Sequence, residues 1–167
     1  MATFSNKGTW VKHDDYMTPK SAWSDIAKYI PTDKVIWEAF YGSGSSGRYL
    51  TELGFNVIHD ATLDFFIENR GEIIVSNPPF SLIPKILKRM VLLDKPFILI
   101  MPSSKMNTQY FRDTLKGKIQ IIIPKKRIHF EKLINGVRPD GWRDACYFDC
   151  FYYCYKMDLP NDITWID

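Results

Sequence analysis

Short apolar runs alternate with helix-like segments through most of this 167-residue chain. Strands are predicted at 35–40, 55–59, 71–76, 97–101 and 119–123, and helices at 20–29, 47–53, 83–93 and 108–115. Such alternation is what a parallel sheet with crossover helices requires. The chain is therefore expected to fold as an α/β protein with a doubly wound, mostly parallel sheet.

Two segments depart from this alternation. The stretch between Phe55 and Ile73 is short for a full crossover between parallel strands, which normally takes a dozen or more residues. One strand–helix unit is therefore expected to be shortened or lost. The region after Ile123 is expected to form a long antiparallel excursion with its turn at Asn135-Gly136, ending in a C-terminal hairpin strand at 146–155.

Length and composition indicate a single compact domain that is large enough for an enzyme. A hydrophobic content of 46% is enough for a layered core, and we expect a polar leader at 1–15 followed by a single domain at 16–167, without a separate recognition domain. Apolar runs are far shorter than the roughly 20 residues of a membrane span, and the start of the chain lacks the apolar core of a signal peptide. An intracellular, cytoplasmic protein without a membrane partner is expected.

Three cysteines, Cys146, Cys150 and Cys154, repeat every four residues near the end of the chain. This spacing matches neither a zinc site nor an iron–sulfur signature, and no nearby histidine completes a ligand set. The neighbouring aromatic residues favour a strand. We therefore expect reduced, buried thiols and no metal.

A glycine-rich turn follows the first long apolar strand. The segment Glu38-Ala39-Phe40 leads into Tyr41–Gly47, and glycines at 42, 44 and 47 allow a tight turn and a close approach of the backbone to a ligand. The pattern also suits a dinucleotide. However, the Glu38 carboxylate at the strand end would repel a pyrophosphate and could hold a cationic amino-acid group, so a ligand with an ammonium and no phosphate fits better.

The segment Asn77-Pro78-Pro79-Phe80 follows another strand-like run, 72–75. Proline fixes φ and has no N–H, so two prolines hold the Asn77 and Pro78 carbonyls outward as acceptors. Such a segment can present an amide side chain and carbonyl groups to an amino-bearing ring, with Phe80 beside it. By itself the segment is better explained as a strand-terminating turn, because Asn-Pro pairs are common in turns.

Together these motifs resemble the S-adenosylmethionine-dependent adenine-N6 methyltransferases, especially the small DNA N-6-adenine methyltransferases of phages. In chain order, the matching segments are Tyr16-Met17-Thr18-Pro19, Glu38–Gly44, Asp64-Phe65-Phe66 and Asn77-Pro78-Pro79-Phe80. The resemblance spans about 16–155 and weakens after Pro102. It implies a sheet of the class I methyltransferase type, S-adenosylmethionine as the cofactor, methyl transfer to the N6 amine of adenine in DNA, and a bacterial host cytoplasm if the protein is of phage origin.

The resemblance also implies a set of cofactor contacts. Tyr16 and Thr18-Pro19 would line the methionine end of the cofactor, although Tyr16 could instead be a hydrophobic staple on the following helix. Asp60 lies about 20 residues beyond Glu38, where nucleotide-binding folds offer an acid to the ribose. Asp64 resembles the acid that binds the adenine amino group, and Phe65 or Phe66 could cover one face of that adenine. Asp60 could instead cap a turn, and Asp64 could cap the following short helix. The predicted cofactor-binding residues are Tyr16, Thr18, Pro19, Glu38, Phe40, Gly42, Gly44, Asp60, Asp64 and Phe65.

The catalytic prediction rests on Asn77, Pro78, Pro79 and Phe80. Methyl transfer from a sulfonium to an amine is an in-line displacement, so positioning is the main task of the protein. The Asn77 side chain and the Pro78 carbonyl would accept the two protons of the amine and stabilise the positive charge that develops. Phe80 would stack on the target base once it leaves a duplex or arrives in a single strand.

Nucleic-acid contacts are predicted at Lys105 and at Lys125-Lys126-Arg127, where cations lie near His129 and Phe130. Solvated surface charge is an equally good interpretation of that basic run. The net charge is only +3, so affinity would depend on such clustering. DNA is the favoured partner and RNA the alternative, and sequence selectivity should be low or should depend on a recognition subunit or a second copy of the chain.

Other functions share the same motifs. Asn-Pro-Pro-aromatic segments also serve methylation of guanine N2 or adenine N6 in RNA and of glutamine side chains in protein. A non-catalytic nucleic-acid-binding subunit could retain the same fold. The intact Asn77–Phe80 segment and glycine loop argue against this last alternative.

Overall fold

The computed structural model describes residues 16–132, 137, 140 and 148–167. The predicted polar leader, the predicted turn at Asn135-Gly136 and Cys146 lie outside these residues. Among the described residues, no helix is long and apolar enough to cross a membrane.

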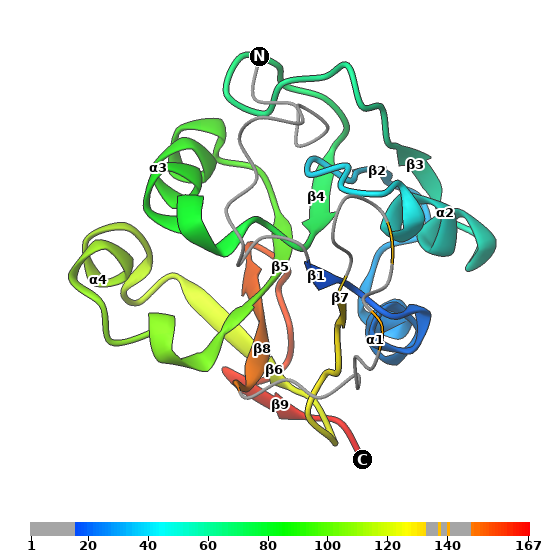
Figure 1. The fold of residues 1–167 in the computed structure, drawn as a ribbon. Helices are drawn as coiled ribbons and strands as arrows, with labels where there is room; N and C mark the ends of the chain where they lie inside the picture. The colour runs from blue at the N-terminus through cyan, green and yellow to red at the C-terminus, as the bar shows by residue number, and fades with distance from the viewer. Residues whose placement is uncertain (1–15, 133–136, 138–139, 141–147) are drawn as a thin grey trace.

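A seven-stranded sheet forms the centre of the fold, in the order β3-β2-β4-β5-β8-β6-β9 (Figure 1). Its strands are β2 Val35–Trp37, β3 Asn56–Ile58, β4 Ile73–Ser76, β5 Phe97–Pro102, β6 Ile119–Ile123, β8 Cys150–Tyr155 and β9 Ile163–Trp165. Only β8 runs antiparallel to its neighbours in this sheet. A small antiparallel sheet pairs β1, Tyr16–Met17, with β7, Glu131–Lys132. The predicted α/β class with a mostly parallel sheet is confirmed.

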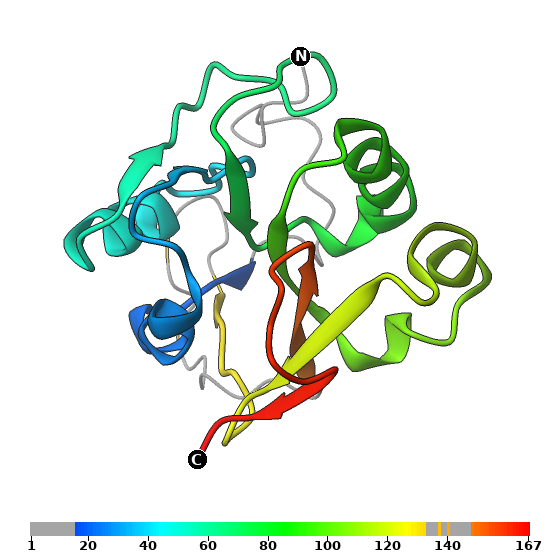
Figure 2. The ribbon, with the colours of Figure 1, turned by 180° about the vertical axis from the view of Figure 1, so that it is seen from behind.

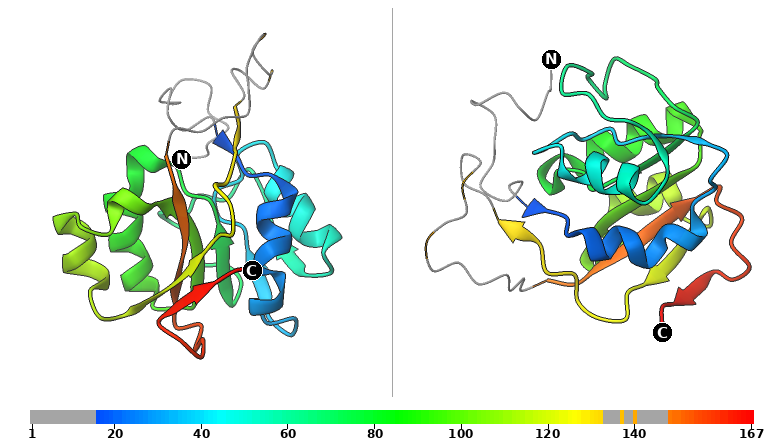
Figure 3. Two further views of the ribbon diagram at one scale, coloured as in Figure 1. Left: turned by 90° about the horizontal axis from the view of Figure 1, so that it is seen from below. Right: turned by 90° about the vertical axis from the view of Figure 1, so that its right-hand side faces the viewer.

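Helices cover both faces of the sheet (Figures 1 and 3). The helices α1, Lys20–Ile26, and α2, Ser45–Glu52, pack on one face, whereas α3, Ile83–Leu93, and α4, Gln109–Leu115, pack on the other. Three short 3-10 helices complete the secondary structure: η1 Ala27–Tyr29, η2 Phe80–Leu82 and η3 Ser103–Lys105. The predicted helix at 20–29 is thus an α-helix followed by a 3-10 turn.

The central strands are apolar on both sides because each side faces a helical layer. In β5, Ile98 and Ile100 join the core cluster under α1 and α2, while Phe97, Leu99 and Met101 join the cluster under α3 and α4. Continuous apolar runs are typical of strands that are covered on both faces.

The late strand β8 follows the same alternation. Tyr152 donates a hydrogen bond from its hydroxyl to the Ala22 carbonyl at 2.7 Å on one side of the sheet, and Tyr153 donates one to the Pro102 carbonyl at 2.8 Å. Cys150 and Cys154 are free and buried in this strand, as expected. Burial raises the pKa of the Cys154 thiol to about 12, which keeps the thiol protonated.

The segment between β3 and β4 contains turns but no helix, so the predicted loss of a crossover unit is confirmed. Arg89 in α3 holds this segment against the molecule by donating to the carbonyls of Phe65, Ile67 and Glu68 at 3.1–3.5 Å.

The sheet differs from expectation in the end of one strand and in one additional strand. The strand predicted at 35–40 ends at Trp37, because the chain then enters the loop toward the glycines. The edge strand β9 was not predicted, and it lies beside β6 near the C-terminus (Figure 2). Its three residues include two exposed apolar side chains, Ile163 and Trp165, so its sequence lacks the burial pattern of a core strand.

Candidate functional site

The predicted site lies at the carboxyl ends of the parallel strands. From β2 the chain continues to β3 on one side, whereas from β4 it continues to β5 on the other. The strand order therefore reverses between β2 and β4, and open α/β sheets bind ligands outside the strand ends at such a switch point. Glu38 follows β2 and Asn77 follows β4, so the structure brings these two predicted residues to this point.

Glu38 is a buried carboxyl group with one free oxygen. Its residue is 2% exposed, and its Oε1 accepts a hydrogen bond from the hydroxyl of Ser76, the last residue of β4. Among the described residues, Oε2 has no hydrogen-bond partner. Burial raises the pKa of Glu38 to about 7, against the opposing effects of the Ser76 hydroxyl and the Phe40 backbone amide. A cation placed at Oε2 would restore the ionised form.

Thr18 and Asn77 carry two further buried oxygens without a partner in the described part of the chain, Oγ1 and Oδ1 respectively. The Asn77 amide nitrogen donates to the Tyr16 carbonyl at 3.3 Å, which holds β1 beside the end of β4. Buried polar atoms in native proteins nearly always have a partner. Unpaired oxygens from three neighbouring segments therefore indicate a place that a polar ligand completes.

The glycine loop needs glycines for two reasons, the positive φ of its backbone and the close contacts of that backbone with other residues. Gly42 has φ 55° and Gly44 has φ 81°, which side chains rarely adopt. The Gly44 amide donates to the Tyr41 carbonyl at 2.7 Å, and a Cβ on Gly44 would lie 2.7 Å from the Tyr41 hydroxyl oxygen. Gly44 precedes the first turn of α2. A Cβ on Gly42 would lie 3.4 Å from the Met17 sulfur, so this loop faces the β1 segment that carries Thr18.

A further residue, His59, belongs to this region and was not predicted. It follows β3, its ring stacks on Tyr41 at 6.1 Å between centroids, and its buried Nδ1 has no hydrogen-bond partner in the described residues. A Cβ on Gly47 would lie 2.5 Å from that nitrogen. The sequence signal for this contact was Gly47, the third glycine of the loop pattern. A glycine there indicates a close neighbour but does not identify the residue.

The two aspartates predicted for the cofactor cap turns. The exposed Asp60 accepts from the backbone amide and the hydroxyl of Thr62 at 2.8 and 2.7 Å, and these bonds lower the pKa of Asp60. The buried Asp64 accepts from the Phe66 amide at 2.8 Å. These contacts match the turn-capping alternative for Asp60, whereas Asp64 caps a turn and not the short helix of its alternative. Their cofactor roles stay predictions.

Phe65 is part of the core and not a cover for a ligand ring. It is 1% exposed, and its ring lies 4.8 Å from that of Phe40 and 5.8 Å from that of Trp37. A ring this deeply enclosed leaves no face for adenine, which corrects the choice of Phe65. The half-buried Phe66, edge-on to Phe65 at 5.4 Å, is the member of the pair with accessible surface.

Four aromatic rings gather beside Asn77. Phe130 and Phe148 stack at 5.9 Å, and both Tyr16 and Phe80 meet this pair edge-on at 5.6–6.2 Å. Phe130 is fully buried, so it supports the site and cannot stack on nucleic acid. Phe80 is half-buried and stays available in part. The other residues predicted here are placed as follows: Pro78 and Pro79 are buried between Asn77 and η2, and Pro19 precedes α1.

The predicted cationic residues follow β5 and β6, whose carboxyl ends lie at the same edge as Asn77. Lys125 and Lys126 are exposed, and Lys105 is half-buried at the end of η3. Arg127 forms a two-point ion pair with Asp149 at 2.7 and 3.1 Å. The guanidinium of Arg127 is thus already bound to a carboxylate, whereas a residue that binds phosphate is expected to have its guanidinium directed to the nucleic acid.

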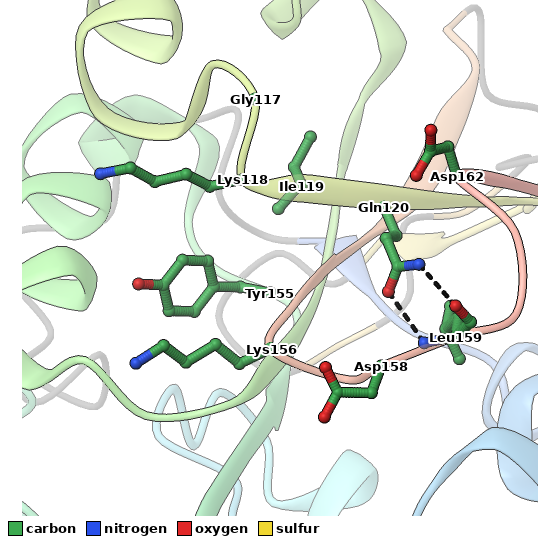
Figure 4. Close-up of a pocket in the computed structure, with 9 residues that line it drawn as sticks. All are labelled: Gly117, Lys118, Ile119, Gln120, Tyr155, Lys156, Asp158, Leu159 and Asp162. Carbon is green, nitrogen blue, oxygen red and sulfur yellow. Dashed lines mark hydrogen bonds between the residues drawn. The ribbon is translucent and has the colours of Figure 1, made fainter.

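A separate open pocket of about 580 Å³ lies at the opposite edge of the sheet, where β6 begins and β8 ends (Figure 4). It contains none of the predicted site residues. Gln120 closes its floor through hydrogen bonds of 2.8 and 2.9 Å to the Leu159 backbone. In the described residues, no group of three or more His, Cys, Asp or Glu side chains could hold a metal ion.

The sequence matches no family model, and no curated protein matches it. Among solved structures, the fold is similar to a proposed class I S-adenosylmethionine-dependent methyltransferase from Listeria monocytogenes, with a TM-score of 0.43 and 11% identity. The match covers 95% of this chain and 67% of that protein. Function is therefore inferred from the site's own residues.

Proposed function

We propose that this protein is an S-adenosylmethionine-dependent methyltransferase that acts on the exocyclic N6 amine of adenine in DNA. The observation that carries the proposal is a group of buried oxygens at the switch point that have no hydrogen-bond partner among the described residues: Glu38 Oε2, Thr18 Oγ1 and Asn77 Oδ1. One carboxylate, one hydroxyl and one amide oxygen suit a ligand with an ammonium group next to a target amine.

The cofactor end of the site fits S-adenosylmethionine better than a dinucleotide. Glu38 would bind the ammonium group of the amino-acid part, and the Thr18 hydroxyl would contact a polar group beside it. Gly42 and Gly44 have no Cβ, so the backbone of the loop can approach the cofactor closely. A pyrophosphate at the same place would meet the buried carboxyl of Glu38, an acceptor that offers no attraction to an anion. When bound, S-adenosylmethionine supplies an electrophilic methyl group.

The chain's own residues would prepare the amine for attack. Asn77 Oδ1 would accept a hydrogen bond from one N–H of the amine and the Pro78 carbonyl one from the other, which stabilises the positive charge that develops on nitrogen. The Asn77 side-chain nitrogen donates a hydrogen bond to the Tyr16 carbonyl, and this bond fixes the orientation of the amide. The amide oxygen is then directed to the substrate. Pro78 and Pro79 restrict the backbone, so the acceptors are held in place before the substrate arrives.

The choice of adenine in DNA rests on the sequence resemblance, supported by the placement of Phe80 and the basic residues. Phe80 adjoins Asn77 with part of its surface accessible, and Lys125 and Lys126 lie exposed at the same sheet edge. A base stacked on Phe80 would have its backbone within the field of these lysines. Selectivity for a DNA sequence would come from a second copy of this chain or from a recognition subunit.

The test is incubation with methyl-labelled S-adenosylmethionine and separate DNA, RNA and protein substrates, followed by nucleoside and amino-acid analysis. Label in N6-methyladenine from DNA is expected. Asn77→Ala should lower the single-turnover rate by about 100-fold or more with cofactor affinity nearly unchanged. Asn161→Ala, an exposed residue away from the site, is the matched control.

Each alternative predicts another outcome of this experiment. Label in RNA, as N6-methyladenine or N2-methylguanine, or in glutamine of protein would replace DNA adenine as the substrate while keeping the chemistry. Binding of nucleic acid without any transfer would identify a non-catalytic subunit. An Asn77→Ala protein that transfers methyl groups at the wild-type rate would overturn the role of Asn77.

A further inference from the structure

Two of the unpaired oxygens are connected through a single residue. Glu38 Oε2 lies at the end of β2 and Asn77 Oδ1 follows β4, and Ser76 stands between them. The Ser76 hydroxyl donates to the other oxygen of Glu38, Oε1, while its backbone is bonded directly to Asn77. The cofactor end and the substrate end of the site are thus joined by one hydrogen bond and one peptide unit.

Ser76 is fully buried, and its side chain has one hydrogen to donate. By donating it to Glu38, the hydroxyl favours the ionised carboxyl group and lowers the pKa of Glu38 against the effect of burial. A cation at Oε2 would strengthen the same charge and tighten the hydrogen bond from Ser76, because bonds to ionised acceptors are shorter and stronger.

The chain after Ser76 has little freedom to absorb such a change. Pro78 restricts the backbone of Asn77 to extended conformations, and both prolines are buried. The Asn77 side chain is held at its nitrogen by the Tyr16 carbonyl at 3.3 Å. A shift of the Ser76 side chain is therefore passed to the Asn77 amide and not dissipated in a flexible loop.

We propose that Ser76 is a positioning residue that couples occupation of the Glu38 carboxylate by a cationic ligand to the placement of the Asn77 amide oxygen. The inference rests on the proposed function, since the cation is the ammonium of S-adenosylmethionine. It assigns a task to a residue that touches neither the cofactor nor the target base. Cofactor binding then prepares the acceptor for the amine.

The coupling can be measured without catalysis. In ligand-free protein labelled with ¹⁵N, the side-chain amide signals of Asn77 should move as pH is raised through about 7, the pKa of Glu38. Glu38→Gln should abolish this movement. Ser76→Ala should reduce its amplitude by at least half and shift its midpoint upward, because the hydroxyl that favours the ionised form is gone.

Catalysis gives the second measurement. Ser76→Ala should lower the single-turnover rate of methyl transfer at least tenfold even when S-adenosylmethionine is saturating at pH 8.5. In a Glu38→Gln background, adding Ser76→Ala should cause much less than this loss, because the two residues act through one bond. Thr114→Ala, which removes a part-buried hydroxyl bonded to the Tyr110 carbonyl in α4, should change neither readout.

Ser76→Cys keeps a donor at the same place, although the thiol is larger and donates more weakly, and it replaces Ser76→Ala if the latter does not fold. It should give intermediate values in both measurements. The proposal is overturned if Ser76 variants keep the wild-type movement of the Asn77 signals, or if saturating cofactor restores their rate fully. Calorimetry of the wild type with S-adenosylmethionine tests the proposed function separately. A wild-type protein that does not bind this cofactor would refute the proposed function.

Discussion

Gly47 in α2 lies directly against the imidazole of His59 at the end of β3, where a Cβ would come 2.5 Å from Nδ1. The His59 ring also stacks on Tyr41, which limits how far the ring can move. Gly47→Ala should therefore destabilise the protein by about 1–3 kcal/mol, the usual cost of overpacking. Thermal or urea unfolding measures this change.

The combination of Gly47→Ala with His59→Ala identifies the cause. Removing the imidazole makes room for the new methyl group, so the double variant should lose less stability than the sum of the two single changes. Strict additivity would show that Gly47 is required for another reason.

Glu38→Gln tests the buried carboxyl group through the pH dependence of stability. The folded-state pKa of about 7 exceeds the ordinary value of 4.5, so the folded protein binds more protons between these values. The free energy of unfolding of the wild type should therefore fall as pH rises from 4.5 to 7, by on the order of 1–3 kcal/mol. Glu38→Gln should remove this fall, whereas Asp113→Asn, which changes an exposed carboxylate in α4, should retain it.

The same group should control affinity for the cofactor. A cationic ligand binds the ionised carboxyl, so affinity for S-adenosylmethionine should rise with pH below 7, by up to about tenfold per pH unit. Calorimetry between pH 5.5 and 8.5 measures this slope. A flat profile in the wild type, or an equal slope in Glu38→Gln, would remove Glu38 from the cofactor site.

Gly44→Ala should weaken cofactor binding through two effects, the unfavourable positive φ and the contact with Tyr41. Gly54→Ala is the matched control, because Gly54 has φ 97° with no atom near its Cβ position. Both variants should lose stability, and only Gly44→Ala should lose affinity for S-adenosylmethionine by tenfold or more. Equal affinities would show that the loop does not contact the ligand.

Phe80→Ala should weaken capture of the target base by roughly 1–3 kcal/mol, the usual value of one aromatic–base stack. It should also lower stability, since Phe80 packs edge-on against Phe130 and Phe148. Phe148→Ala separates these effects because it disturbs the same aromatic cluster. Fluorescence anisotropy with single-stranded DNA should show a larger affinity loss for Phe80→Ala than for a Phe148→Ala protein of similar stability.

Salt dependence distinguishes the cations after β6. Lys125→Ala and Lys126→Ala should each reduce the slope of log affinity against log salt by about one, if each lysine neutralises a phosphate. Arg127→Ala should have a smaller effect on the slope, because its guanidinium is already paired with Asp149. A larger effect of Arg127→Ala would mean that this ion pair opens on nucleic acid.

The fold class could be predicted from sequence, because the alternation of apolar runs and amphipathic segments is a local property of the chain. The missing crossover helix was also predictable, since only residues 60–70 separate the strands predicted at 55–59 and 71–76. Glu38 and Asn77 could be placed at one sheet edge from the same pattern, because residues that follow parallel strands must share that edge.

Which side chains are accessible and which are paired could be learned only from how distant segments pack together. Two adjacent phenylalanines, Phe65 and Phe66, read alike in sequence, and only packing buries the first against Phe40 and Trp37. Likewise, the bond from Ser76 to Glu38 joins residues 38 positions apart. Whether a buried carboxyl group keeps a free oxygen depends on neighbours from distant parts of the chain, and no local pattern encodes them.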